Sequence, residues 1–178
     1  MKVSIYSILF LFVLFSACGD DSQSVLEVRN QTDYQLFAGQ GIIATHYFTN
    51  FDVPTLWTSH VGNSGLDDNG LGDVLANRAT LESIFGEDLN FIDRVSVYAY
   101  PNDPVAYQNG ELAGTEIFFL DFAEIRSKTE VQLFGNLTVL NDIITEDRMI
   151  IELRLNYRSI SPSNLDVRLN MEFSVFEK

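Results

Sequence analysis

Two long stretches near the C-terminus alternate between apolar and polar residues. In RMIIELRLNYR (148–158) and DVRLNMEFSVF (166–176) the odd positions are apolar and the even positions mostly polar, Ile150 being an exception. A period of two places successive side chains on opposite faces of an extended strand. Between the stretches, SISPSNL (159–165) contains Pro162, which cannot donate a hydrogen bond to a sheet. The two stretches therefore predict a long antiparallel hairpin with one buried face and one polar face that mixes Arg and Glu.

Six further segments have the composition of strands. They are rich in β-branched and aromatic residues and cover 25–30, 33–38, 44–51, 94–100, 115–122 and 131–140. Turn-forming residues separate several of them, at 30–33 (NQTD), 101–104 (PNDP) and 109–110 (NG). Eight strands predict an all-β fold, an antiparallel β-sandwich that is immunoglobulin-like or related, with at most one or two short helices. The chain has one cysteine, which excludes the immunoglobulin disulfide.

The segment from residue 63 to residue 90 fits no single element. NSGLDDNGLGDV (63–74) has the Gly and Asp content of a loop. In DVLANRATLESIF (73–85) the spacing of Val74, Leu81 and Phe85 half fits a helix, while ATLESIF also half fits a strand. We favour a short helix here, and residues 71–86 stay open between helix and strand.

Composition narrows the class of protein. The chain has 178 residues, of which 46% are hydrophobic, so one domain with a substantial core is expected. The formal net charge is −14, from 11 basic and 25 acidic residues. A surface of this sign argues against a nucleic-acid partner, because phosphate binding depends on basic side chains.

The first residues have the pattern of a secretory signal. Lys2 supplies a positive charge, residues 5–15 (IYSILFLFVLF) are almost wholly apolar, and the small residues Ser16 and Ala17 follow. The apolar run is shorter than the roughly 20 residues that a membrane-spanning helix needs. We therefore expect a targeting segment that directs export, not a permanent membrane span.

FSAC (15–18) resembles the lipobox of bacterial lipoproteins, although that family usually has Leu where this chain has Phe15. The resemblance implies cleavage before Cys18 and lipidation of its thiol, so that the lipid anchors the protein in a membrane. It divides the chain into a signal peptide (1–17), a lipidated cysteine with a flexible tether (18–24) and one β-sandwich domain (25–178). Two or three acyl chains would make the anchor almost permanent.

The residues after the cysteine indicate a location. CGDDSQS (18–24) resembles the start of lipoproteins of the Bacteroidota, in which an acidic pair directs export to the cell surface. Asp20 and Asp21 would be that signal in this chain. Alternatively, the two aspartates solubilise a tether, and the protein faces the periplasm from the outer membrane.

The mature chain contains no familiar catalytic motif. It has two histidines, His46 and His60, which we interpret as surface or turn residues, and its one thiol is assigned to lipid. The sequence predicts no cofactor and no enzyme activity, while paired carboxylates that meet only in space keep a hydrolase open as an alternative. The loop residues Asp67, Asp68, Asn69 and Asp73 are a weak calcium candidate, because they offer oxygen ligands but do not match the EF-hand spacing.

Aromatic residues in THYFTNFDVPTLWTSH (45–60) suggest a ligand surface. Tyr47, Phe51 and Trp57 could form an exposed platform for sugar rings, or they could fill the core as most large aromatic residues do. The sequence as a whole predicts a lipid-anchored outer-membrane lipoprotein, exposed on the cell surface, with a binding or interaction domain. Its partner would be a glycan or an envelope protein, and a structural subunit of an envelope assembly is a further alternative.

Overall fold

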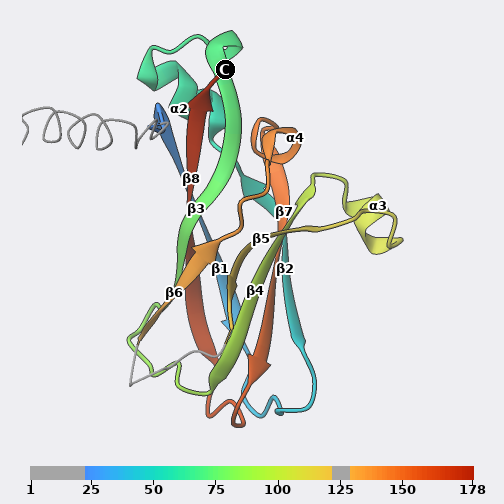
Figure 1. Cartoon of the computed structure of the whole chain (residues 1–178). Coiled ribbons are helices and arrows are strands. Elements are labelled where there is room, and N and C mark those ends of the chain that lie inside the picture. The colour runs from blue at the N-terminus through green and yellow to red at the C-terminus, as the bar shows by residue number, and fades with distance from the viewer. Residues whose placement is uncertain (1–22, 122–128) are drawn as a thin grey trace, which may run out of the picture.

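The computed structural model describes residues 23–121 and 129–178, and nearly all of them belong to an all-β domain (Figure 1). The strands are β1 (Leu26–Leu36), β2 (His46–Pro54), β3 (Leu71–Ser83), β4 (Ile92–Pro101), β5 (Thr115–Leu120), β6 (Glu130–Gly135), β7 (Arg148–Tyr157) and β8 (Leu165–Glu177). They form one eight-stranded sheet in the order β1-β8-β3-β6-β5-β4-β7-β2, with every pairing antiparallel. The predicted all-β antiparallel class is confirmed.

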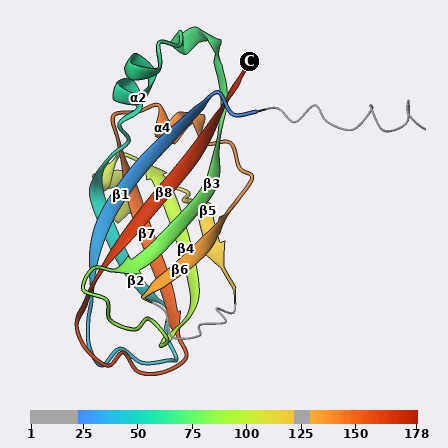
Figure 2. The same cartoon turned by 90° about the vertical axis from the view of Figure 1, so that its left-hand side faces the viewer.

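The sheet folds over so that its two halves face each other. Figure 2 shows β1, β8, β3 and β6 in front of β2, β7, β4 and β5. In the described sheet, the strand pairing between the two halves consists of two residue pairs of the short strands β5 and β6, Phe118↔Gly135 and Phe119↔Phe134. The arrangement is therefore sandwich-like, although the strands belong to one continuous sheet and not to two separate ones.

The core lies between the two halves and comes from the inward positions of every strand. The rings of Phe118 and Phe173, both fully buried, meet across the halves with centroids 5.6 Å apart. The odd positions of β7 and β8 point inward as the alternation predicts, and Leu153, Leu155 and Leu169 are fully buried. Burial of this apolar surface, at about 25 cal/mol per Å², is the main source of stability.

The predicted hairpin of the last two strands is wrong. β7 pairs with β2 and β4, whereas β8 pairs with β1 and β3, so the two consecutive strands are central in opposite halves. The connection between them crosses from one half to the other and packs on the loop after β1. Ser161 is buried there, and its hydroxyl donates to the carbonyl of Phe37 at 2.7 Å. Alternation fixed which face of each strand is buried, but it carries no information on which strand lies beside it.

The preference for a helix in residues 73–85 is also wrong, because β3 occupies Leu71–Ser83. Two irregularities in its pairing with β8 explain the misleading pattern, one between Leu71 and Val74 and one between Ala76 and Arg78. An extra residue at a β-bulge shifts the side-chain alternation by one. The buried residues of β3 are consequently three positions apart at each irregularity, Leu71 to Val74 and Ala76 to Ala79, and this spacing resembles that of a helix.

A predicted turn at residues 30–33 is replaced by continuous strand. β1 pairs with β8 without interruption from Leu26 to Leu36. Two of the four polar residues that suggested a turn, Asn30 and Thr32, face inward and bond to the neighbouring edge of the sheet, while Gln31 and Asp33 face outward. Asn30 Nδ2 donates to the carbonyls of Pro54 and Thr55, both at 2.7 Å, and the hydroxyl of Thr32 accepts from Asn50 Nδ2 at 2.7 Å.

Helices are short and lie in the connections between strands. The described residues contain α2 (Trp57–Ser64), α3 (Pro104–Gln108), α4 (Asn141–Ile144) and the 3₁₀ turn η1 (Asp68–Gly70), which is more than the one or two expected. The start of α3 shows why such short helices form, since Asp103 accepts hydrogen bonds from the amides of Val105 and Ala106 and Pro104 opens the first turn. None of the helices in the described parts of the chain has the length and apolar content needed to cross a membrane.

Candidate functional site

The outer surface of β2, β7 and β4 carries a group of aromatic side chains around one ion pair. We call it the tyrosine face; its members are Tyr47, Phe51, Tyr98, Tyr100, Tyr107, Glu152 and Arg154. The strand register brings them together, because Tyr47 lies opposite Arg154 and Tyr98 lies opposite Glu152 in neighbouring strands. Tyr107 comes from α3, in the connection between β4 and β5. Two of the three predicted platform residues, Tyr47 and Phe51, thus belong to this surface.

A buried carboxylate organises the tyrosine face. Glu152 is only 6% exposed, and its Oε1 accepts from Arg154 Nε at 2.6 Å and from the hydroxyl of Tyr100 at 3.2 Å. Its Oε2 accepts a short hydrogen bond from the hydroxyl of Tyr107. Both carboxylate oxygens therefore have partners, as a buried charge requires. The group fixes the orientation of the surrounding rings.

Burial and the nearby carboxylate keep the phenols protonated. Burial, followed by the hydrogen bond to Glu152, raises the pKa of Tyr107 to about 12. The pKa of Tyr100 is raised as well, by burial and by the negative charge of Glu152. Both hydroxyls therefore remain hydrogen-bond donors to the carboxylate throughout the physiological pH range.

Arg154 links the buried group to the surface. Its guanidinium carbon lies 3.6 Å from the ring centroid of Tyr98 and 5.5 Å from that of Tyr47, and its Nη2 donates to the Tyr100 hydroxyl at 3.1 Å. A guanidinium over an aromatic ring is a favourable cation–π arrangement. Tyr47 is 60% exposed and Phe51 is 36% exposed, with the Phe51 ring edge-on to Tyr107. The result is a pre-ordered aromatic surface that is open to solvent at Tyr47 and Phe51.

The connection from β4 to β5 packs closely on this face. A Cβ atom added at Gly114 would lie 2.3 Å from Cζ of Tyr100, so only glycine fits there. The ring of Tyr100 is also edge-on to that of Tyr107, with centroids 4.9 Å apart. Tyr100 is thereby covered, and it is 6% exposed.

Trp57 does not belong to the platform, which corrects the sequence-based grouping. It opens α2, is 6% exposed, and belongs to the hydrophobic core. Its indole Nε1 donates to Asp68 Oδ1 at 3.2 Å. The side chain therefore ties α2 to η1, and most of its apolar surface is already used in packing.

The calcium candidates do not converge on one point. Asp67 Oδ1 accepts from the backbone and side-chain nitrogens of Asn69, both at 3.1 Å, while Asp68 is bonded to the indole of Trp57. Asp73 follows in β3 as an exposed side chain. Across residues 23–121 and 129–178, no group of three or more His, Cys, Asp or Glu side chains is placed to hold a metal ion.

The histidines lie on separate elements with separate partners. His46 stacks on Tyr157 with centroids 4.6 Å apart, and its Nε2 bonds to the carbonyl of Gly41 at 2.8 Å. His60 Nε2 lies 3.5 Å from the backbone nitrogen of Arg29. Their contacts are those of structural side chains. The predicted lipid acceptor Cys18 and the export signal Asp20 and Asp21 lie outside the described residues.

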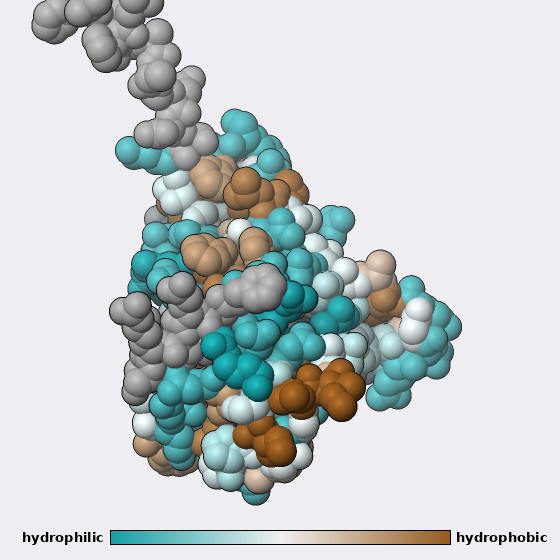
Figure 3. Space-filling view, turned by 60° about the horizontal axis from the view of Figure 1, so that its bottom comes forward, coloured by the Kyte–Doolittle hydropathy of each residue, from teal (hydrophilic) through white to brown (hydrophobic). Residues whose placement is uncertain are grey.

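A second exposed surface is apolar and lies at one end of the domain. Figure 3 brings forward the end opposite the C-terminus, where apolar side chains gather on the loops. The most exposed of them are Ile43 (99%), Phe85 (73%) and Ile160 (65%). Exposed apolar groups in loops are typical of contacts with another macromolecule.

The tyrosine face was only partly foreseeable from the sequence. Tyr98 and Tyr100 alternate on the polar face of their strand, as Glu152 and Arg154 do on theirs, and this shared orientation was a usable signal. The proximity of the two strands was not predictable, because it depends on the pairing of β4 with β7. The contribution of Tyr107 depends on a loop that folds back over the sheet.

Comparisons with known proteins add no function. No protein-family model matches the chain, and no curated protein matches it. Among solved structures, a chain described as Desmodium yellow mottle tymovirus is similar over 85% of this chain and 88% of its own length, with 12% sequence identity. The TM-score of that match is 0.28, which is too low to support an argument about either fold or function.

Proposed function

We propose that this chain is a lipoprotein of the outer membrane, anchored through a lipidated Cys18 and exposed on the cell surface, whose β-domain binds glycans. The observation that carries the binding part is the tyrosine face, where Arg154 holds Tyr47 beside a buried Glu152 and leaves the Tyr47 ring 60% exposed. Aromatic rings held in place offer apolar contact area at little entropic cost, and phenol and guanidinium groups beside them offer hydrogen bonds. Sugar rings, with apolar C–H faces and hydroxyl edges, match that combination.

A binding role is favoured over catalysis by the state of the carboxylate. Both oxygens of Glu152 accept hydrogen bonds from neighbouring side chains. A general acid or base must exchange a proton with its substrate and therefore needs a reachable oxygen. Glu152 is better suited to orient the rings than to react.

The glycan proposal is tested by affinity electrophoresis of the mature protein in gels that contain xylan, pectin or laminarin. We expect at least one polysaccharide to retard the protein, and Tyr47→Ala to weaken the interaction about tenfold, equivalent to roughly 1.4 kcal/mol. Phe134→Ala is the matched control, since Phe134 is also 60% exposed but lies in β6 of the other half. Equal retardation of both variants, or no retardation by any of the three polysaccharides, would contradict the proposal.

The anchor and the location are tested on intact cells. Protease should remove the domain from wild-type cells, and it should spare the domain when Asp20 and Asp21 are both replaced by Ala. Cys18→Ala should abolish incorporation of labelled fatty acid and release the protein from the membrane fraction. Protection of the wild-type domain while the outer membrane is intact would assign the protein to the periplasmic side.

The apolar end favours one second candidate, a subunit of an envelope assembly. Ile43, in the loop between β1 and β2, is 99% exposed, and the loops with the exposed Phe85 and Ile160 lie at the same end of the domain; gathered apolar groups of this kind mark interaction sites. Chemical crosslinking on cells should then capture a neighbouring envelope protein, and Ile43→Asp should abolish the crosslink. An unchanged crosslinking pattern in this variant would exclude the apolar end as the contact.

A further inference from the structure

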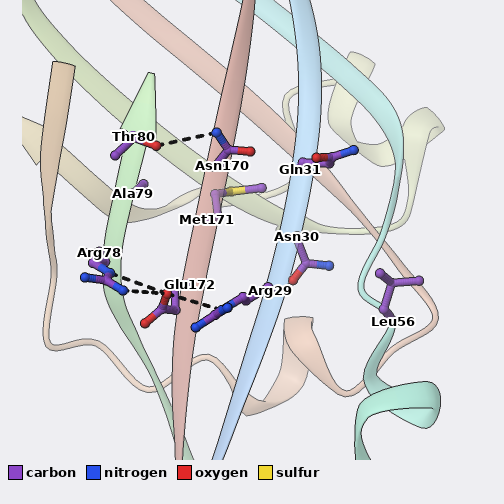
Figure 4. A pocket seen from close by; sticks show the side chains of 10 residues that line it. All are labelled: Arg29, Asn30, Gln31, Leu56, Arg78, Ala79, Thr80, Asn170, Met171 and Glu172. Atoms are coloured by element: carbon purple, nitrogen blue, oxygen red, sulfur yellow. Dashed lines mark hydrogen bonds and ion pairs between the residues drawn. The ribbon is translucent and has the colours of Figure 1, made fainter. Parts of the chain in front are cut away.

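A groove of about 530 Å³ crosses the outer surface of β1, β8 and β3, on the half of the sheet that does not carry the tyrosine face (Figure 4). The strand register builds it from two rows of side chains. Arg29, Glu172 and Arg78 form one row, and Gln31, Asn170 and Thr80 form the next. Leu56, in the connection from β2 to α2, closes the groove beyond the edge of β1.

The first row places two guanidinium groups around one carboxylate. Glu172 is 9% exposed, and its Oε2 lies 3.4 Å from Arg29 Nε and 3.1 Å from Arg78 Nη2. The two arginine side chains are 66% and 58% exposed, and neither Nη1 has a partner among the described residues. Arg29 also contacts Glu27 at 2.9 Å, but Glu27 does not line the groove. Both guanidinium groups therefore share Glu172 in the groove, and Arg29 also pairs with a second carboxylate, Glu27, outside it.

The second row offers neutral hydrogen-bonding groups. Asn170 Nδ2 donates to Thr80 Oγ1 at 3.5 Å and to Glu82 Oε1 at 3.1 Å, which turns the Asn170 oxygen toward β1 (Figure 4). Gln31 lies beside it on β1. The groove thus has cationic donors along one side and amide and hydroxyl groups along the other.

A buried acceptor without a partner lies close to the groove. Asn30 is 5% exposed, and its Nδ2 is fixed by the carbonyls of Pro54 and Thr55. This leaves Asn30 Oδ1 without a hydrogen bond in the described structure, but the side chain faces inward and the atom is not accessible from the groove. Leu56, which closes the groove, has a positive φ of 58°, a strained conformation of the kind that gathers at ligand sites.

We propose that this groove is a second binding site and that its ligand is an acidic saccharide, with a sugar carboxylate on Arg29 and Arg78 and sugar hydroxyls on the row of Gln31, Asn170 and Thr80. Guanidinium groups bind carboxylates in a planar, bidentate manner, which provides the selectivity for acid over neutral sugar. Sugar hydroxyls match the polar row of Gln31, Asn170 and Thr80, which a simple inorganic anion would leave unused. The site does not depend on the tyrosine face, since the two lie on opposite halves of the sheet.

Titration calorimetry of the mature protein tests the site, with a galacturonate tetramer, a neutral galactose tetramer and inorganic phosphate as probes. We expect the acidic tetramer to bind and the neutral one to bind at least tenfold more weakly. Arg29→Gln and Arg78→Gln should each weaken binding of the acidic tetramer about tenfold, and raised salt should weaken it further. Gln31→Ala should weaken the acidic tetramer and leave any binding of phosphate unchanged.

The control variant is Arg168→Gln, on the same surface of β8. Arg168 already makes a two-bond ion pair with Asp33, at 2.8 and 2.9 Å, and does not line the groove, so binding should not change. Tyr47→Ala should also leave this binding intact, which separates the groove from the glycan site proposed above. Equal binding of the acidic and neutral tetramers, or unchanged binding in both arginine variants, would overturn the proposal. Phosphate binding as tight as that of the acidic tetramer would overturn the assignment to a saccharide.

Discussion

Replacing Glu152 by Ala removes the acceptor at the centre of the tyrosine face. The variant leaves Arg154, whose side chain is 29% exposed, without its ion-pair partner, and removes the carboxylate that accepts from the hydroxyls of Tyr100 and Tyr107. Breaking a buried ion pair costs about 3–5 kcal/mol, and the partial exposure of Arg154 favours the lower end. We expect the free energy of unfolding to fall by about 3 kcal/mol. For a domain of this size the melting temperature should fall by roughly 6–12 °C.

The chain provides its own reporter for this measurement. Trp57 is the single tryptophan and is 6% exposed in the core, so its fluorescence follows global unfolding in urea. Glu172→Ala is the matched control, because Glu172 is also a buried carboxylate but its guanidinium partners are 66% and 58% exposed. The control should lose about 1 kcal/mol, since exposed guanidinium groups recover their hydration. A loss below 1 kcal/mol for Glu152→Ala, or equal losses for both variants, would refute the idea that Glu152 organises this face.

Two further predictions follow from close contacts and from an ion pair. Gly114→Ala should destabilise the domain by about 1–3 kcal/mol in urea unfolding, because the added Cβ would lie 2.3 Å from a ring atom of Tyr100. The control is Gly62→Ala in α2, where an added Cβ would have no atom within 4 Å. This control should be neutral or stabilising by up to about 1 kcal/mol. The hydrogen bonds from Arg168 hold the pKa of Asp33 below its ordinary value of 3.8. The ion pair therefore stabilises the folded state at pH values above 3.8, and this stabilisation disappears as the pH falls through the lower pKa of the folded state. Asp33→Asn should therefore lose less stability than the wild type between pH 5 and pH 2, and an identical pH profile would show that the pair contributes nothing.

The sequence predicted which face of each strand is buried better than it predicted which strands are paired. Period-two patterns located β7 and β8 and correctly assigned residues such as Leu153 and Leu169 to the core, because a strand must present one apolar face wherever it lies. Which strands pair depends on how the whole chain packs, and the alternation within one strand does not indicate which strand lies beside it. The expected hairpin between β7 and β8 failed for that reason.

Local irregularity explains the remaining errors. The bulge between Ala76 and Arg78 gave β3 a spacing of apolar residues that resembles a helix. The polar residues Asn30 and Thr32 suggested a turn, although their side chains point inward from a continuous strand. Trp57 was grouped with Tyr47 by proximity in the sequence, yet it follows β2 and turns into the core. Both candidate binding surfaces combine residues from three or more elements, so neither could be assembled before the register was known.

The pairing of the first strand with the last has a consequence for the order in which the chain can fold. β8 is the only strand that joins β1 to β3 in the described sheet, and all eleven residues of β1 pair with it. Half of the sheet therefore cannot assemble until residues 165–177 are available. Contacts between such distant parts of a chain slow folding, because a long loop must close before any of them forms. Until the last strand arrives, β1 and β3 have no strand between them, so this half of the sheet is completed only when the C-terminal end of the chain is present.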